Sequence, residues 1–145
     1  MPTISKTALV PYTPRQMYAL VNDIEAYQEF LPWCRSSRLL SRDDDEIRAT
    51  LEIAHGSLRK SFTTCNRLQR DKMVEMRLVE GPFQHLEGFW RFDMLGEDAC
   101  KVSLDLDFEF SNRLISMAMG PLFSQIANSL VDAFSKRAVD VYGKS

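Results

Sequence analysis

The chain has 145 residues, of which 45% are hydrophobic and 26% charged, and its formal net charge is −2. This length and composition predict one ordinary globular domain over residues 1–145. The mild negative charge argues against DNA binding by the domain as a whole, although a local basic patch remains open.

The first elements along the chain are a strand and a short helix. Residues 3–10, TISKTALV, are rich in β-formers and precede a proline, which predicts an edge strand. Thr13 then offers an N-cap and Pro14 a first-turn proline, so a helix is expected over about 14–22. Asp23 is placed to cap a second short helical turn.

The stretch AYQEFLPWCR, residues 26–35, concentrates large apolar side chains in an irregular connection. It is too short and too interrupted for a core helix, and it lacks the alternation of a strand. Either the segment plugs a core, or it frames a site. As the frame of a site, Phe30 and Leu31 would face inward, Pro32 would enforce a turn, and Trp33 would close the rim of a pocket.

Residues 34–110 predict antiparallel strands joined by short turns. In KVSLDLDFEF, residues 101–110, apolar side chains alternate with polar ones, a period of two that is typical of a sheet with one wet face. Residues 46–55, 74–78 and 86–94 alternate in the same way. Because the breaks are short and carry no helical pattern, we expect a meander rather than parallel βαβ units.

The period changes to that of a helix in the last third of the chain. A helix of about 22 residues from Pro121 would span about 33 Å. Its apolar stripe is formed by Leu122, Ile126, Leu130, Phe134, Ala138 and Val141. The preceding stretch NRLISMAMGP is also helix-like, and Gly120-Pro121 is expected to kink or split the helix. These patterns predict an α+β fold, in which a curved antiparallel sheet of about seven strands surrounds a long C-terminal helix.

Aromatic and methionine side chains exceed what a small core needs. A strongly curved sheet around one helix can leave a void, so an apolar ligand cavity is one explanation. A tightly filled core is the other. The candidate ligand-binding residues are Phe30, Leu31, Trp33, Phe62, Met76, Phe83, Trp90, Phe92, Met117, Phe123 and Ile126.

Known catalytic and metal-binding motifs do not occur in the sequence. His55 and His85 share no short ligand spacing with the cysteines, and no HExxH, G-x-S-x-G, P-loop or G-x-G-x-x-G pattern is present. The acidic run at residues 43–46 is typical of a solvated hairpin tip, with a cation site as the alternative. We therefore expect neither an enzyme, nor a metal site, nor a resident cofactor.

Charged side chains on the wet face of the sheet form two features. The first feature is an acidic row formed by Asp105, Asp107 and Glu109. We expect arginines on other strands to pair with this row, and the alternative is that the row meets a charged partner. The second feature is a locally basic strip, the candidate contact for ribosomal RNA, formed by Arg59, Lys60, Arg67 and Arg70. The segment holds one aromatic residue, so stacking of single-stranded nucleic acid is a poor match.

Three stretches carry a resemblance to a known family. They resemble the coenzyme Q-binding protein and ribosome association toxin RatA family. The stretches are YALVNDIEAYQEFLPWC (18–34), EGPFQHLEGFWRF (80–92) and AFSKRAVDVYG (133–143). The resemblance covers nearly the whole chain. It implies the START-like, helix-grip fold of the polyketide cyclase-type superfamily, with two short helices after the first strand. Gln28 departs from the family, which usually has proline there, and this should loosen the local turn.

The resemblance implies two different activities. In one, a non-enzymatic lipid-binding protein holds ubiquinone or a similar isoprenoid as its carried ligand and supports respiration. In the other, a RatA-type toxin binds the large ribosomal subunit and blocks its association with the small one. The aromatic surplus and mild charge favour the quinone activity, whereas the Leu-Pro-Trp-Cys form looks bacterial and favours the RatA label.

The expected location is the cytoplasm. No apolar run approaches 18 residues, and the start of the chain lacks the pattern of a signal peptide. Cys34, Cys65 and Cys100 are odd in number and far apart, which indicates a reducing compartment. A quinone-binding protein would also be expected to contact the inner membrane transiently, at its periphery.

Overall fold

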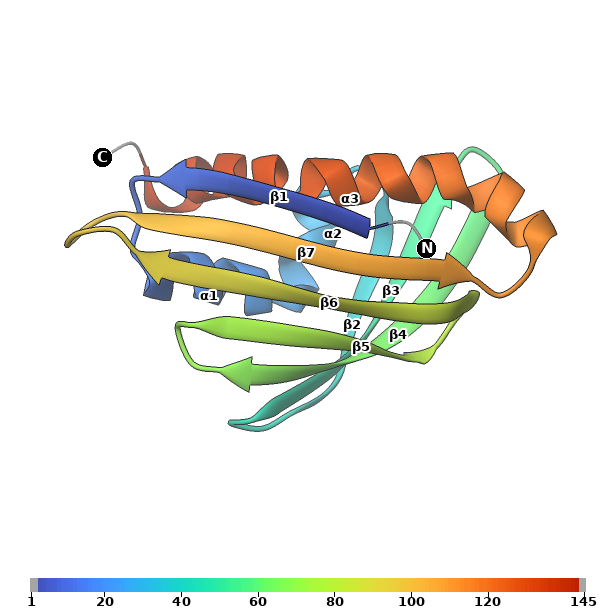
Figure 1. The fold of residues 1–145 in the computed structure, drawn as a ribbon, viewed down its shortest axis with the longest axis horizontal. Coiled ribbons are helices and arrows are strands. Elements are labelled where there is room, and N and C mark those ends of the chain that lie inside the picture. The colour runs from blue at the N-terminus through green and yellow to red at the C-terminus, as the bar shows by residue number, and fades with distance from the viewer. Residues whose placement is uncertain (1–2, 144–145) are drawn as a thin grey trace.

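A seven-stranded antiparallel sheet and a 30-residue helix make up most of the fold. The computed structural model describes residues 3–143. The elements in chain order are β1 (Thr3–Val10), α1 (Pro14–Asn22), the 3₁₀ helix η1 (Ile24–Ala26), α2 (Tyr27–Phe30), β2 (Cys34–Arg42), β3 (Glu46–His55), β4 (Leu58–Gln69), β5 (Met73–Glu80), β6 (Phe83–Met94), β7 (Cys100–Phe110) and α3 (Arg113–Tyr142). The strand order β1-β7-β6-β5-β4-β3-β2 confirms the predicted meander and the predicted edge strand (Figure 1).

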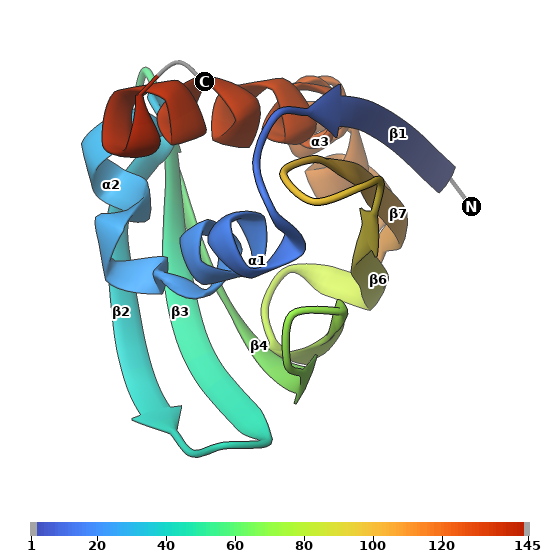
Figure 2. The ribbon, with the colours of Figure 1, turned by 90° about the vertical axis from the view of Figure 1, so that its left-hand side faces the viewer.

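The sheet has one buried face because apolar residues alternate along its strands as predicted. The inward residues of β7 are all buried: Val102, Leu104, Leu106, Phe108 and Phe110. The register pairs Leu104 with Trp90 and Leu106 with Gly88 on β6, so inward positions of neighbouring strands share one face. Figure 2 shows the sheet curling around α1, with α3 lying across the open side.

Helix α1 begins at a capping box, as the Thr13-Pro14 pair predicts. Thr13 Oγ1 accepts a hydrogen bond from Gln16 N at 3.1 Å, and Gln16 Oε1 accepts one from Thr13 N at 2.8 Å. The expected cap at Asp23 is wrong, because in the described chain its side chain makes no capping hydrogen bond to η1. Its backbone N–H instead closes α1 by donating to Leu20 O at 3.3 Å.

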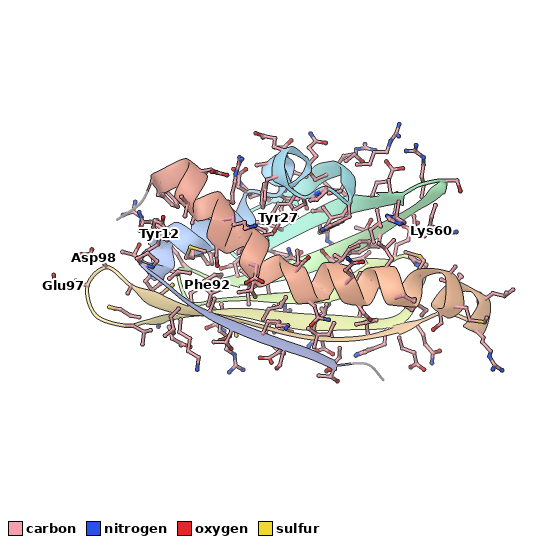
Figure 3. All side chains as sticks on the ribbon, turned by 90° about the horizontal axis from the view of Figure 1, so that it is seen from above. Tyr12, Tyr27, Lys60, Phe92, Glu97 and Asp98 are labelled. Carbon is pink, nitrogen blue, oxygen red and sulfur yellow. The ribbon has the colours of Figure 1, made fainter. Side chains whose placement is uncertain are left out.

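Helix α3 is longer than predicted and is not split at Pro121. Asn112 caps its start by accepting a hydrogen bond from Ile115 N at 2.9 Å, and the helix runs unbroken through the proline. Proline removes one helical hydrogen bond, and Figure 3 shows the helix bending along its length. Buried Met119 packs the turn before the proline onto the core. The predicted apolar stripe stops at Ala138, because Val141 is 49% exposed beyond the core.

The C-terminal end of α3 is fastened to the first elements of the chain. The Tyr142 hydroxyl donates to Gln16 O at 2.9 Å, and the Tyr12 hydroxyl donates to the carbonyl after the helix at 2.5 Å. The Arg137 guanidinium lies 4.8 Å from the centre of the Phe30 ring, a cation–π contact. These contacts fix the end of α3 against α1 and α2.

Buried side chains beneath α3 form two clusters. One lies among α1, α2 and the C-terminal half of α3 and includes Trp90 and Phe134. The other lies under the N-terminal half of α3 and includes Phe108 and Phe123.

Helix α3 is long and apolar enough to cross a membrane, by length and composition alone. Core helices of proteins outside membranes meet the same criteria. Here Phe123, Val131 and Phe134 are buried against the rest of the protein. Packing on the sheet therefore accounts for this buried stripe, whereas Leu114 and Met117 near the start of α3 are exposed.

Candidate functional site: an apolar cavity beneath the long helix

A cavity of about 80 Å³ lies between α3 and the concave face of the sheet. It exists because α3 packs closely along β1, β7 and α1, while it stands farther from the middle strands. The lining residues are mostly apolar and come from the segment before β2, from strands β3 to β7 and from α3: Ile24, Tyr27, Trp33, Ala49, Leu51, Phe62, Thr64, Asn66, Met76, Leu86, Trp90, Leu106, Phe123, Ile126, Ala127, Leu130 and Phe134.

Besides the indole N–H groups of Trp33 and Trp90, three uncharged lining side chains carry a hydroxyl or amide group. Tyr27, next to α3 in Figure 3, donates its hydroxyl proton to the carbonyl of Val21. Burial raises the pKa of the Tyr27 phenol far above its ordinary value, so the phenol stays protonated and its O–H remains in this hydrogen bond. Thr64 and Asn66 lie two residues apart on β4. Asn66 is 5% exposed, and its Oδ1 has no hydrogen-bond partner within residues 3–143.

Gly88 lets two lining side chains pack against the backbone of β6. A Cβ atom at this position would lie 2.7 Å from Leu106 Cδ1 and 3.2 Å from Met76 Cε, and both of those side chains line the cavity. Any side chain at position 88 must therefore push Leu106 or Met76 aside.

An open groove of about 290 Å³ adjoins the cavity, between α3 and the segment that leads into β2. Trp33 and Ile126 line both spaces and therefore form a wall between them. The Trp33 carbonyl accepts a hydrogen bond from Ala54 N at 2.9 Å, which fixes the backbone of this residue. Displacement of the indole would join the cavity to the groove, and the joint volume would reach the lower end of the range of about 300–1,000 Å³ usual for ligand pockets.

The structure places part of the predicted ligand-binding set on the cavity wall. The predicted residues found there are Trp33, Phe62, Met76, Trp90, Phe123 and Ile126. Leu31 lies in the adjoining groove instead.

The remaining aromatic residues of that set belong to the packed core. Phe30 meets the Phe134 ring edge-on with 5.2 Å between ring centres, and Phe83 stacks on Phe110 at 4.9 Å. Phe92 stacks beside the tryptophan two residues earlier, with 6.4 Å between ring centres. Neighbouring rings fill the space that a ligand would need at these positions.

The expectation that Met117 lines the cavity is wrong. Met117 is 70% exposed, because it lies on the side of α3 that faces away from the sheet, whereas Met119 is 1% exposed. The polar lining residues Thr64 and Asn66 were not predicted. Their signal is present in the sequence, since a period of two puts both on the same face as Phe62.

The four basic residues of the predicted strip do not form one patch. Arg59 and Lys60 lie at the start of β4, and Arg70 follows its other end. The 12 residues of this strand span roughly 40 Å at about 3.3 Å each. Arg67 has a glutamate as its cross-strand partner on either side. Arg59 and Lys60 remain as an adjacent exposed pair, which forms no ion pair with any described residue.

The acidic row on β7 is held by hydroxyl groups of the edge strand. Thr3 Oγ1 donates to Asp107 at 2.7 Å, and Ser5 Oγ donates to Asp105. The predicted pairing with arginines does not form on this row in the described part of the chain, because β1 lies beside it.

Acid–base groups are placed away from the cavity. Apart from Tyr27, the lining residues include no acidic, basic or thiol side chain. His55 lines the open groove and His85 lies on the outer face of the sheet, near a glutamate. Burial raises the pKa of both the Cys34 and Cys100 thiols to about 11. Among residues 3–143, no three His, Cys, Asp or Glu side chains gather as a metal site would require.

The curved sheet, the helix across it and the internal apolar space define a START-like protein. The family model described as "Polyketide cyclase / dehydrase and lipid transport" matches residues 10–135. The crystal structure of Zhui aromatase/cyclase from Streptomyces sp. R1128 has a TM-score of 0.83 and 14% identity, over 94% of this chain and 93% of that one. At this identity the likeness shows the fold alone.

Two relatives narrow the family further. "Ribosome association toxin RatA" of Pseudomonas aeruginosa is 48% identical over 140 residues, which cover 97% of each chain. "Coenzyme Q-binding protein COQ10 homolog B, mitochondrial" of Xenopus laevis is 30% identical over 144 residues, covering 97% of this chain and 59% of the relative. The chain belongs to the coenzyme Q-binding protein and RatA family, as its three sequence stretches predict.

Proposed function

We propose that this protein is a non-enzymatic carrier of an apolar isoprenoid ligand, ubiquinone or a similar quinone, and that it supports respiration. The observation that carries the proposal is the apolar cavity under α3, separated by Trp33 and Ile126 from an open groove. The relative from Xenopus laevis is named as a coenzyme Q-binding protein, which agrees with this ligand class.

Ligand entry would need the cavity to expand. At about 80 Å³ the cavity is smaller than the pockets that hold drug-sized molecules, which measure about 300–1,000 Å³. In the proposal the indole of Trp33 moves out of the wall, and the quinone ring enters while its isoprenoid tail lies along the groove. Brief contact with the inner membrane would supply the ligand.

A carrier role without catalysis agrees with the chemistry of the lining. Acyl or proton transfer needs a nucleophile, or an acid and a base, within hydrogen-bond reach of the substrate. Thr64 and Asn66 are neutral, and the Tyr27 hydroxyl is already used as a donor.

The proposal is tested by native mass spectrometry of the freshly purified protein, followed by lipid extraction. We expect an adduct with the mass of a prenyl quinone. Ala127→Leu fills the cavity from α3 and should abolish the adduct, since Ala127 is fully buried in the lining. Ala118→Leu, the matched control, adds the same side chain at an exposed position of the same helix. Ligand-free protein that also fails to bind added ubiquinone would contradict the proposal.

A second candidate function is inhibition of ribosomal subunit association. The observation that favours it is the 48% identity to a relative named "Ribosome association toxin RatA". In this candidate Arg59 and Lys60, the adjacent exposed cations, contact phosphates of the large subunit, and binding weakens with salt.

Sucrose-gradient profiles of overexpressing cells test this second candidate. Wild-type protein should deplete 70S particles in favour of free subunits. The double variant Arg59→Glu/Lys60→Glu should restore them, while Lys101→Glu, an exposed control on β7, should not. An unchanged profile with wild-type protein would exclude this function.

A further inference from the structure

Asn66 lines the cavity and carries a buried hydrogen-bond acceptor, its Oδ1 atom, that has no partner among residues 3–143. The residue is 5% exposed. Its cross-strand partners are apolar, Ile47 on β3 and Met76 on β5. A buried acceptor without a partner lowers stability, so such atoms in native proteins require an explanation.

Residues 3–143 do not supply the missing donor. The Tyr27 hydroxyl donates to a backbone carbonyl, and no described side chain, Thr64 included, donates to Asn66 Oδ1. A cavity of about 80 Å³ has room for an ordered water, which needs polar partners such as these two side chains. A ligand that displaces such a water must replace its hydrogen bond, or binding weakens.

We propose that Asn66 binds a hydroxyl group of the carried ligand, so that the cavity prefers a hydroquinone to the corresponding oxidised quinone. This inference rests on the proposed quinone-binding function. An amide oxygen accepts hydrogen bonds and an amide nitrogen donates them. The nitrogen can donate to an oxygen of either redox form, but only the hydroquinone carries an O–H that can donate to Oδ1.

The apolar surroundings determine the size of this preference. In a low-dielectric site a hydrogen bond is stronger than in water, and an unmet acceptor costs correspondingly more. A neutral hydrogen bond of ordinary strength corresponds to a roughly five- to tenfold difference in affinity.

The test uses the two tryptophans of the chain, Trp33 and Trp90, which both line the cavity. Their fluorescence is followed during anaerobic titration with ubiquinone-2 and with its reduced form, ubiquinol-2. Dissociation constants come from the concentration dependence, so the different quenching strengths of the two forms do not matter. We expect the reduced form to bind roughly five- to tenfold more tightly.

Two variants assign the preference to Asn66. Asn66→Leu keeps the size of the side chain and removes its polar atoms, so the two forms should bind within about twofold of each other. Met76→Leu changes an apolar lining residue directly across from Asn66 and should keep the preference.

The titrations distinguish failure of the Asn66 assignment from failure of the carrier function. Equal affinities in the wild type, tighter binding of the oxidised form, or an unchanged ratio in Asn66→Leu would overturn the assignment to Asn66 and leave the carrier function standing. The wild-type comparison needs no variant to fold. Absence of quenching by both forms would contradict the carrier function itself.

Discussion

The core under α3 is solid at one end and hollow in its middle, although both regions use similar residues. At the solid end, which we call the aromatic end, the rings are those of Phe83, Phe108, Phe110 and Phe123. Phe123 lies 4.7 Å from Phe108 and 5.0 Å from Phe83 between ring centres. In the cavity region the inward positions include Thr64, Asn66 and Gly88 among the apolar side chains.

This difference shows which residues create the space. Aromatic side chains occur in both regions, so their number does not distinguish a filled core from a cavity. The cavity region differs by Gly88, against which Leu106 and Met76 pack, and by the polar lining residues Thr64 and Asn66. Of these, Asn66 has no partner for its Oδ1 among residues 3–143. A binding role for this region therefore depends on its smallest and most polar residues as much as on its rings.

The largest expected effect is at the aromatic end. Phe108→Ala removes a ring that is 1% exposed and contacts both Phe110 and Phe123. The free energy of unfolding should fall by about 3–5 kcal/mol, measured by urea denaturation. A loss below about 1 kcal/mol would mean that this end is not densely packed.

A smaller loss is expected at the boundary of the cavity. Gly88→Ala places a Cβ within 2.7 Å of Leu106 and forces cavity-lining side chains to move. We expect a loss of about 1–3 kcal/mol in unfolding free energy and weaker binding of ubiquinone-2. Unchanged stability together with unchanged affinity would show that position 88 does not constrain the cavity-lining side chains.

In the cavity region one substitution should stabilise the ligand-free protein. Asn66→Leu removes a buried acceptor that has no partner among residues 3–143. Thermal unfolding without ligand should show a gain of about 1 kcal/mol. Destabilisation by a similar amount would mean that Asn66 is satisfied in the empty protein.

The smallest effect concerns the buried thiols, which distinguish the interior from the outer face. Near neutral pH, a thiol reagent should label half-buried Cys65 before Cys34 and Cys100. In the same pH range the thiols should not alter the free energy of unfolding. Burial raises the pKa of Cys34 and Cys100 from an ordinary 9.0 to about 11. Between these values the unfolded chain loses protons that the folded chain keeps, so stability should fall as the pH rises from about 9 to about 11. Flat stability across this range would contradict the burial of both thiols.

Much of the fold follows from local patterns in the sequence. The period of two along β7 and the Thr13-Pro14 start of α1 depend on neighbouring residues, and the structure has both as predicted. The continuity of α3 through Pro121 could not be predicted locally, because the sheet and buried Met119 hold the helix on both sides of the proline.

The site was harder to predict than the fold. Periodicity tells which face of a strand is buried, but it does not tell whether the space opposite is filled. Phe83 and Phe62 both face inward, yet Phe83 is enclosed by other rings while Phe62 also reaches the cavity. Met117 was misplaced because the buried stripe continues from Phe123 back to Met119, and a residue two positions away lies about 200° around the helix.

The central claim is that a quinone enters the space under α3, and the two tryptophan indoles report on it directly. Both Trp33 and Trp90 line the cavity, and the chain contains no other tryptophan. In a ¹H–¹⁵N correlation spectrum, titration with ubiquinol-2 should shift both indole N–H signals and reach saturation together. If both signals stay in place while the ligand binds, the ligand lies outside the cavity and the account is wrong.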